Sequence, residues 1–206
     1  MEKRELRRVV KERFRALDEA EKQQKSAAVV LRLGEILAQR EASVVALFSP
    51  MDDEVQLAPL VEKLAKEGRC RVVLPRVESM ADGEAEMEFY DYNPTQMAVG
   101  AFGIIEPQAG EPCPASEIDV MVVPGVAFDR NGGRLGRGKG YYDRYISREG
   151  FRAECIGVCF DYQLFDKLPT EPHDRAMDMV VSDNSKFKIQ NKIIYNFEKN
   201  WECLTN

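Results

Sequence analysis

Cations and glycines alternate in one short segment of the chain. Glycines stand at positions 133, 136, 138 and 140, and Arg134, Arg137 and Lys139 lie between them. Glycine lets main-chain N–H groups approach a ligand closely, and Arg and Lys donate charge-assisted hydrogen bonds to phosphate oxygens. The pattern therefore favours a cradle for a polyphosphate.

The spacing of this segment comes within one residue of a P-loop, because Gly133 is followed after four residues by Gly138 and Lys139. Gly140 stands where a P-loop has Ser or Thr, so the hydroxyl that would bind Mg²⁺ is missing. Asp143 follows closely and is a candidate metal ligand, since Mg²⁺ usually binds one or two carboxylates and phosphate oxygens. The alternative is a flexible turn with solvated charges. So dense an alternation between a buried strand and a helix disfavours that alternative.

The composition bounds the class of protein. The 206 residues include 29 Lys and Arg against 35 Asp and Glu, a formal net charge of −6, with 44% hydrophobic and 31% charged residues. These values are typical of a soluble domain with a full core, and net acidity disfavours a general nucleic-acid binder. No apolar run is long enough to span a membrane, and the charged start lacks a signal-peptide core. We expect a cytoplasmic protein that binds neither nucleic acid nor membrane.

The five cysteines and the N-terminal charges refine this expectation. An odd number of cysteines without C-x-x-C spacing disfavours disulfides and a cysteine zinc site, which leaves packing thiols. The first 15 residues carry seven cations around apolar positions at helical spacing, such as Leu6, Val10 and Phe14. Two basic segments in an acidic chain indicate a small anionic ligand. Nothing in the sequence requires more than a monomer.

Helical and strand patterns alternate along the chain. Helices are expected over residues 3–17, 19–39, 57–67 and 140–148, and buried strands over 43–48, 71–75, 118–125, 155–160 and 179–182. Residues 78–117 are acidic and contain a possible edge strand at 86–92. This rhythm predicts an α/β fold with an open, mostly parallel sheet and helices on both faces. Residues 1–183 form the expected single domain. Residues 184–206 are expected to be an extension, either a docked helix or a frayed tail.

The chain also resembles the 5-formyltetrahydrofolate cyclo-ligases, or methenyltetrahydrofolate synthetases. The resemblance spans roughly residues 1–183, and its most specific part is Gly136-Arg137-Gly138-Lys139-Gly140-Tyr141-Tyr142-Asp143. Supporting motifs are Lys3-Arg4-Glu5-Leu6-Arg7, Met51-Asp52-Asp53-Glu54, Pro124-Gly125-Val126-Ala127-Phe128-Asp129 and Pro169-Thr170-Glu171-Pro172-His173-Asp174.

This resemblance implies a ligase that uses ATP and Mg²⁺ to cyclise 5-formyltetrahydrofolate to 5,10-methenyltetrahydrofolate, releasing ADP and phosphate. In the family scheme, the formyl oxygen attacks the γ-phosphate to give an N5-iminium phosphate, and N10 then displaces phosphate. The implied fold is a single-domain three-layer sandwich of the NagB/RpiA-like type.

The resemblance also implies site residues. The implied ATP-binding residues are Lys3, Arg4, Glu5, Leu6, Arg7, Arg134, Leu135, Gly136, Arg137, Gly138, Lys139, Gly140, Tyr141 and Tyr142. Of these, Arg4, Glu5 and Leu6 are implied to contribute their main chain. The implied folate-binding residues are Ser49, Met51, Glu54, Arg137, Gly138, Lys139, Gly140 and Tyr141. The implied catalytic cations are Lys139, Arg137 and Arg134, and the implied magnesium ligands are Asp143 and Asp178.

Two other functions compete with this interpretation. A sugar-phosphate isomerase on a similar sheet would need fewer cations for its monophosphate than this segment offers. A CoA transferase would need a carboxylate nucleophile, and the sequence shows no clear one. A nucleotide- or RNA-binding module would use the basic N-terminal helix. The net acidity of the chain disfavours this function. Other residues have simpler interpretations: His173 as a structural turn residue rather than an acid–base group, and Glu54 as a helix N-terminal acid.

Overall fold

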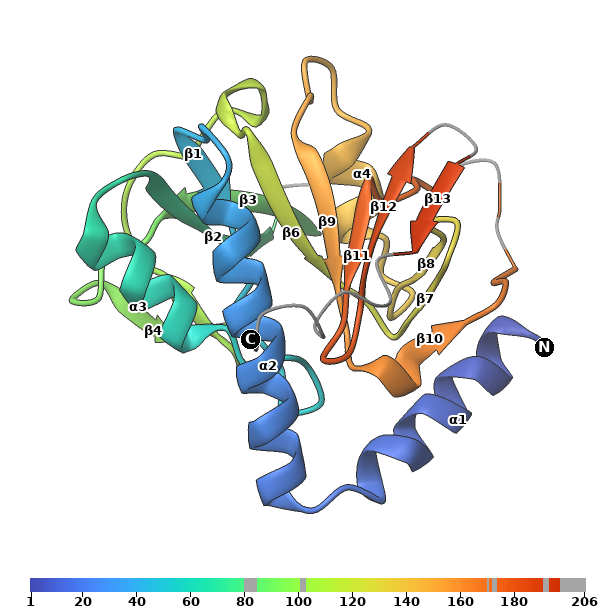
Figure 1. The fold of residues 1–206 in the computed structure, drawn as a ribbon. Helices are drawn as coiled ribbons and strands as arrows, with labels where there is room; N and C mark the ends of the chain where they lie inside the picture. Colours follow the sequence, from blue (N-terminus) through green and yellow to red (C-terminus); the bar gives the residue numbers. More distant parts are fainter. Residues whose placement is uncertain (80–84, 101–102, 170, 172–173, 191–192, 197–206) are drawn as a thin grey trace, which may run out of the picture.

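An eight-stranded sheet runs through the centre of the molecule in the order β13-β12-β11-β9-β6-β1-β2-β3 (Figure 1). The computed structural model describes residues 1–79, 85–100, 103–169, 171, 174–190 and 193–196. The strands β2, β1, β6, β9 and β11 pair in parallel, and β3, β12 and β13 pair antiparallel at the two ends. The strands are β1 (Val44–Ala46), β2 (Arg71–Ser79), β3 (Ala85–Asp91), β6 (Val120–Pro124), β9 (Glu154–Val158), β11 (Met179–Val181), β12 (Lys186–Gln190) and β13 (Ile193–Asn196).

Helices cover both faces of this sheet. The helices α2 (Glu19–Ala38) and α3 (Ala58–Glu67) lie on one face, and α4 (Tyr141–Ile146) lies on the other (Figure 1). Neighbouring strand residues alternate between the two cores: Val45 packs with the α2 and α3 side chains, and Ala46 packs with those of α4. This alternation follows from the two-residue period of a strand. The predicted α/β fold with helices on both faces is confirmed.

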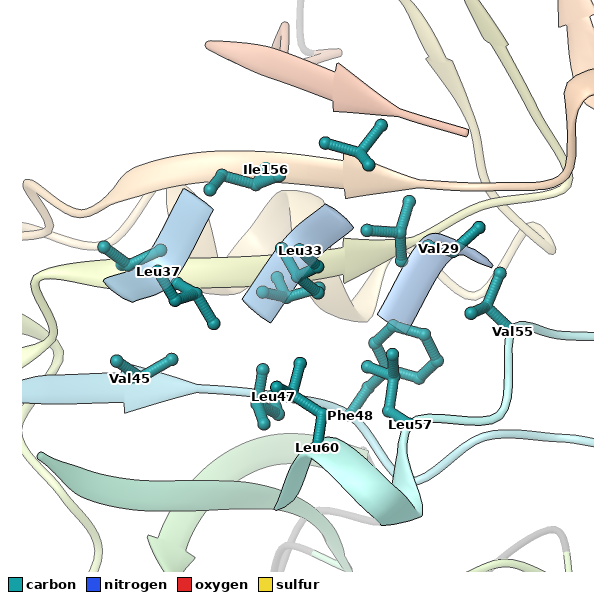
Figure 2. Close-up of a cluster of buried hydrophobic side chains, with 14 of the residues drawn as sticks. Val29, Leu33, Leu37, Val45, Leu47, Phe48, Val55, Leu57, Leu60 and Ile156 are labelled. Atoms are coloured by element: carbon teal, nitrogen blue, oxygen red, sulfur yellow. The ribbon is translucent and has the colours of Figure 1, made fainter. Parts of the chain in front are cut away.

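The larger core lies under α2. Figure 2 shows Val29, Leu33 and Leu37 of α2 across the face of the sheet, between the strands that carry Val45 and Ile156. The side chains of α3, with the loop before it, close the same cluster. This close packing fixes the carboxyl ends of the parallel strands, where ligands bind in open α/β sheets.

The N-terminal helix α1 (Lys3–Arg15) packs on a small second sheet. That sheet has the order β10-β7-β8 and consists of β7 (Ala127–Asp129), β8 (Arg134–Leu135) and β10 (Leu164–Phe165). Leu6 and Val10 pack against Ala127 and Leu135, so the apolar stripe of α1 attaches the helix to β7 and β8. The basic N-terminus thereby lies against the glycine-rich segment.

The acidic excursion contains two pairings. The predicted edge strand at 86–92 is confirmed as β3, which pairs antiparallel with β2. A hairpin of β4 (Met97–Val99) and β5 (Ile105–Pro107) packs beside β2. Short 3-10 turns lie at Ala115–Glu117 (η2) and Asp161–Gln163 (η3).

The C-terminal extension differs from its helical prediction. The strands β12 and β13 form an antiparallel hairpin that continues the main sheet from β11. Apolar residues at positions 189, 193, 197 and 201 repeat at a helical spacing, but Ile193, Ile194 and Tyr195 are neighbours with high β-propensity. Phe197 and Trp201 lie outside the described residues. Local β-propensity together with the open edge of β11 accounts for the hairpin.

Among the residues that the structure describes, no helix combines the length and the apolar character that a bilayer span needs.

Candidate active site

A cavity of about 560 Å³ lies beside the carboxyl ends of β1 and β6. Ser49 and Pro124 mark those strand ends on its wall, and Lys3 and Arg7 of α1 reach it from the N-terminus. The predicted site residues that line it are Lys3, Arg7, Ser49, Met51, Glu54, Arg134, Leu135, Gly136, Arg137, Gly138, Lys139, Gly140, Tyr141, Tyr142 and Asp143. The two basic segments therefore meet around one space.

Buried Asp129 fixes the start of the glycine-rich segment. Its Oδ1 accepts hydrogen bonds from the main-chain N–H groups of Asn131 and Gly133, each at 2.8 Å. Its Oδ2 accepts from Leu168 N at 2.9 Å. A Cβ atom on Gly133 would lie 2.5 Å from Asp129 Oδ2, so this close approach requires glycine. The sequence motif contained Asp129, but its anchoring role was missed.

The segment then turns into α4 through two glycines with positive φ. Gly138 has φ 101° and Gly140, the N-cap of α4, has φ 68°, a region that other residues rarely adopt. The guanidinium of Arg144 donates to the Lys139 main-chain oxygen at 2.8 Å, which holds the turn to the helix that it begins.

Arg134 is almost enclosed, with 4% of its side chain exposed. Its Nη2 donates to Asp143 Oδ1 at 2.8 Å, and its Nη1 donates to the Pro124 main-chain oxygen at 3.2 Å. The guanidinium lies 5.7 Å from the centre of the Tyr142 ring. Because these contacts fix its orientation, Arg134 presents a preorganised positive charge at the cavity wall.

Arg137 links the glycine-rich segment to the loop after β1. Its Nε donates to Glu54 Oε1 at 3.1 Å, and its Nη2 forms an ion pair with Asp53. Glu54 Oε2 accepts from Met51 N at 3.0 Å. Burial raises the pKa of Glu54, while the Met51 N–H and the charge of Arg137 act in the opposite direction. Asp53 belongs to the Met51–Glu54 motif, but its contact with Arg137 was not predicted from the sequence.

The cations of α1 are held differently. Lys3 Nζ donates to Glu171 Oε1 at 2.8 Å and to Asp174 Oδ2 at 3.2 Å, and the Glu171 bond is the main cause that raises the pKa of Lys3. Arg7 donates to the Gly136 main-chain oxygen. Glu171 and Asp174 stand in a motif that supports the family resemblance, but their pairing with Lys3 was not predicted from the sequence.

The side chains of three predicted contact residues of α1 do not line the described cavity. Leu6 is 1% exposed, and its side chain packs in the core between α1 and the small sheet. The ATP contact implied for residues 4–6 is a main-chain contact, and it stays a prediction. The side chains of Arg4 and Glu5 are exposed and do not line the described cavity. Helical periodicity explains the difference, because residues 3 and 7 share a face and residues 4 to 6 point elsewhere.

The two predicted magnesium ligands are separated. Asp143 lines the cavity, but Asp178 is not among the described residues that line it. Asp178 Oδ2 instead accepts from Cys155 N at 2.8 Å, at the amino end of β9. Asp143 fits a magnesium ion, because Arg134 binds only its Oδ1 and Mg²⁺ takes one or two carboxylates with phosphate oxygens. Asp178 does not fit this role in the observed arrangement.

Other residues line the cavity that were not predicted from the sequence. They are Phe48, Pro75, Val77, Met87, Ile104, Glu106, Pro124, Gly125, Glu171 and Asp174. The apolar members come from strands and from the β4–β5 hairpin, and sequence alone does not show that this hairpin packs beside β2. His173 lies outside the described residues.

The fold and the cavity define a class of protein. A parallel α/β sheet, a cationic glycine-rich segment before a helix, and a cavity at the strand ends are typical of enzymes that bind phosphorylated nucleotides. Comparisons with known proteins then identify the family.

The model of the 5-formyltetrahydrofolate cyclo-ligase family matches residues 1–183. The Escherichia coli K12 5-formyltetrahydrofolate cyclo-ligase is 32% identical over 178 residues, covering 84% of this chain and 96% of the relative. A solved 5,10-methenyltetrahydrofolate synthetase from Aquifex aeolicus matches with a TM-score of 0.80 and 34% identity, covering 98% and 100% of the two chains. A Mycoplasma pneumoniae synthetase matches with a TM-score of 0.72 and 27% identity, covering 89% and 99%.

The chain belongs to the 5-formyltetrahydrofolate cyclo-ligase family and is an enzyme of the ligase class. This result confirms the resemblance seen in the sequence. It replaces the isomerase, transferase and binding-module alternatives.

Proposed function

We propose that the chain uses ATP and Mg²⁺ to cyclise 5-formyltetrahydrofolate to 5,10-methenyltetrahydrofolate, releasing ADP and phosphate. The observation that supports this most directly is one cavity lined by cations from two distant segments and by Glu54. Five cationic side chains line it, Lys3, Arg7, Arg134, Arg137 and Lys139, more than a monophosphate needs.

The cationic wall suits phosphoryl transfer. Such reactions depend mainly on positioning and on neutralising the charge of the transferred group. Arg134 is fixed by Asp143 and the Pro124 oxygen, so its charge needs little reorganisation during reaction. Lys139 lies at the turn into α4 and is proposed to bind the γ-phosphate. Arg137 would contact the phosphate from the side nearest Glu54.

Asp143 would hold magnesium together with oxygens of the nucleotide. When bound, Mg²⁺ supplies charge neutralisation on the phosphates. Asp143 also orients Arg134, so the same carboxylate arranges two positive charges around the phosphates.

Glu54 is proposed to bind the pterin ring. A carboxylate can accept from two adjacent N–H donors of an aminopyrimidine. Its present partners, Arg137 and Met51 N, hold both of its oxygens at the cavity wall. Ser49 and Met51 line the same region, and the ring of Tyr141 offers a stacking face.

The proposed reaction has two chemical stages. The formyl oxygen attacks the γ-phosphate, which converts a poor leaving group into a phosphate ester of an N5-iminium. N10 then forms a bond to the activated carbon, and the carbon–oxygen bond to phosphate breaks. The cavity residues would bring the two substrates together and exclude water from the activated intermediate.

A cytoplasmic location, a monomeric state and the lack of nucleic-acid binding stay predictions. They are independent of the proposed chemistry.

The direct test measures methenyl absorbance after mixing the purified chain with 5-formyltetrahydrofolate and Mg²⁺, with and without ATP. Product is expected only with ATP, together with one ADP per methenyl group. Product that forms at the same rate without ATP, or no product at all, would contradict the proposal.

A further inference from the structure

A buried carboxylate lies on the part of the cavity wall that the sequence did not predict. Glu106, in the middle of β5, is 2% exposed and lines the cavity. β5 packs beside β2, whose residues Pro75 and Val77 also line the cavity. Arg76 ties the hairpin to β2 by donating from Nη1 to the Pro107 oxygen at 3.3 Å. The apolar wall therefore carries an acidic group.

The turn of the hairpin makes room for this carboxylate. Gly100 donates its N–H to the Ile104 oxygen at 2.8 Å, which closes the turn beside Glu106. A Cβ atom at Gly100 would lie 2.0 Å from Glu106 Oε2, so any side chain there would displace the carboxylate. The position of Glu106 at the cavity depends on glycine at residue 100.

Four further acids line the cavity, and each of them binds a cation of the site. Glu54 binds Arg137, Asp143 binds Arg134, and Glu171 and Asp174 bind Lys3. These four acids orient the cations that the proposed reaction needs. Among the described acids that line the cavity, Glu106 is the least exposed, at 2%.

Burying a carboxylate against apolar surface costs free energy, because its charge loses contact with water. Acids in such positions are found at catalytic sites, where they exchange protons with a bound substrate. Ring closure in the proposed reaction releases one proton from N10. A carboxylate on the cavity wall can accept that proton.

We propose that Glu106 contacts the folate substrate and is the base that accepts this proton. The inference rests on the proposed function. In this step N10 forms its bond to the activated carbon, and the proton of N10 passes to the Glu106 carboxylate. The carbon–oxygen bond to phosphate breaks, its electron pair leaves with phosphate, and the carboxylic acid returns its proton to solvent after product release.

The test replaces Glu106→Gln, which keeps the size of the side chain and removes its basicity. Because general base catalysis contributes about 10²–10⁴-fold, kcat should fall by about 100-fold or more. The KM for ATP should stay unchanged, so the loss should appear in kcat and not in nucleotide binding. The matched control is Glu111→Gln, an exposed acid beyond the hairpin, which should react like the unsubstituted chain.

Two outcomes would overturn the inference. An unchanged kcat would show that Glu106 lines the wall without reacting, and a raised folate KM with unchanged kcat would show recognition alone. Both presuppose that the unsubstituted chain forms ATP-dependent product. If it does not, the proposed function fails first, so the two failures are distinguishable.

Gly100→Ala gives an independent test. The added methyl group must push the Glu106 carboxylate away, so kcat should fall in the glutamate background. In the Glu106→Gln background the same substitution should cost little more, because the base is already absent. Additive losses in the double variant would contradict the role of Glu106. Thermal unfolding of each variant establishes that the chain is folded.

Discussion

Arg7 donates from Nε and Nη2 to the main-chain oxygen of Gly136, at 3.1 and 3.0 Å, across 129 residues of sequence. This pair of hydrogen bonds joins the N-terminal helix to the glycine-rich segment at the cavity. While Nε and Nη2 donate to the main-chain oxygen, these two groups are not available to donate to a phosphate. In this arrangement the first role of Arg7 is to hold the segment in place.

We therefore expect Arg7→Ala to act through the position of the segment. Hydrogen bonds to charged groups contribute about 1.5–3 kcal/mol, so the KM for ATP should rise roughly 10-fold to 100-fold. The control is Arg8→Ala, because Arg8 is exposed and pairs with Glu12 on the outer face of α1. Equal effects of the two substitutions on the KM for ATP would contradict the proposed role of Arg7 in holding the glycine-rich segment.

Lys139 is expected to matter more than any other cation of the cavity. Lys139→Ala removes the ammonium proposed to neutralise the γ-phosphate, so kcat should fall by about 10³-fold, as for the loss of a strong electrostatic contact. The matched control is Lys66→Ala on the exposed face of α3. Single-turnover measurement with saturating ATP separates the chemical step from nucleotide binding. A change in ATP affinity with unchanged kcat would show that Lys139 binds the nucleotide and does not act in the chemical step.

The pH dependence of folate binding should report Glu54. Burial, the largest cause, raises the pKa of this carboxyl, so it takes up a proton at a higher pH than an exposed glutamate does. The carboxylate form is the proposed pterin acceptor, and therefore kcat/KM for folate should fall as pH falls through the raised pKa. Glu54→Gln should lower kcat/KM near neutral pH and remove this dependence. A profile with the same acid limb in the variant would assign the limb to another group.

Much of the fold was predictable from sequence because its elements are locally encoded. The helices α2 and α3 have apolar stripes of helical period, and β6 is a continuous apolar run, as expected for a central parallel strand. The small sheet of β7, β8 and β10 was not predicted. Its two-residue strands, such as Arg134–Leu135, are too short to show a period. They form because α1 and Leu168 pack on them.

The site was predictable to the extent that its residues lie in one motif. The glycines of the glycine-rich segment show in the sequence where its backbone must turn. Which other residues line the cavity beside it depends on tertiary packing. Glu106 is one acid in an acidic region, and only the pairing of β4 with β5 beside β2 brings it to the cavity. Likewise, nothing in the sequence indicates that the carboxylate of Asp178 accepts a hydrogen bond from Cys155 N.

Leu6 provides a test of packing against ligand contact. Leu6→Ala removes buried methyl groups between α1 and the small sheet, which should lower the free energy of unfolding by about 2–5 kcal/mol. Leu6→Met keeps most of the volume and should cost less than about 1.5 kcal/mol. Both are measured by denaturant unfolding, with ATP affinity determined on the folded chain. If Leu6→Met weakens ATP binding without loss of stability, Leu6 contacts the nucleotide after all.

Asp143 and Asp178, the two magnesium ligands predicted from the sequence, should differ in their effect on the Mg²⁺ requirement. Asp143→Asn removes a negative charge at the cavity and loosens Arg134, so the Mg²⁺ concentration for half-maximal rate should rise by about 10-fold or more. Asp178→Asn keeps an oxygen that can accept from Cys155 N, so its Mg²⁺ requirement should match that of the unsubstituted chain. Magnesium titrations at saturating ATP measure both values. A parallel rise in the Asp178 variant would mean that β11 moves toward the cavity when nucleotide binds, because the observed arrangement leaves its carboxylate at the amino end of β9.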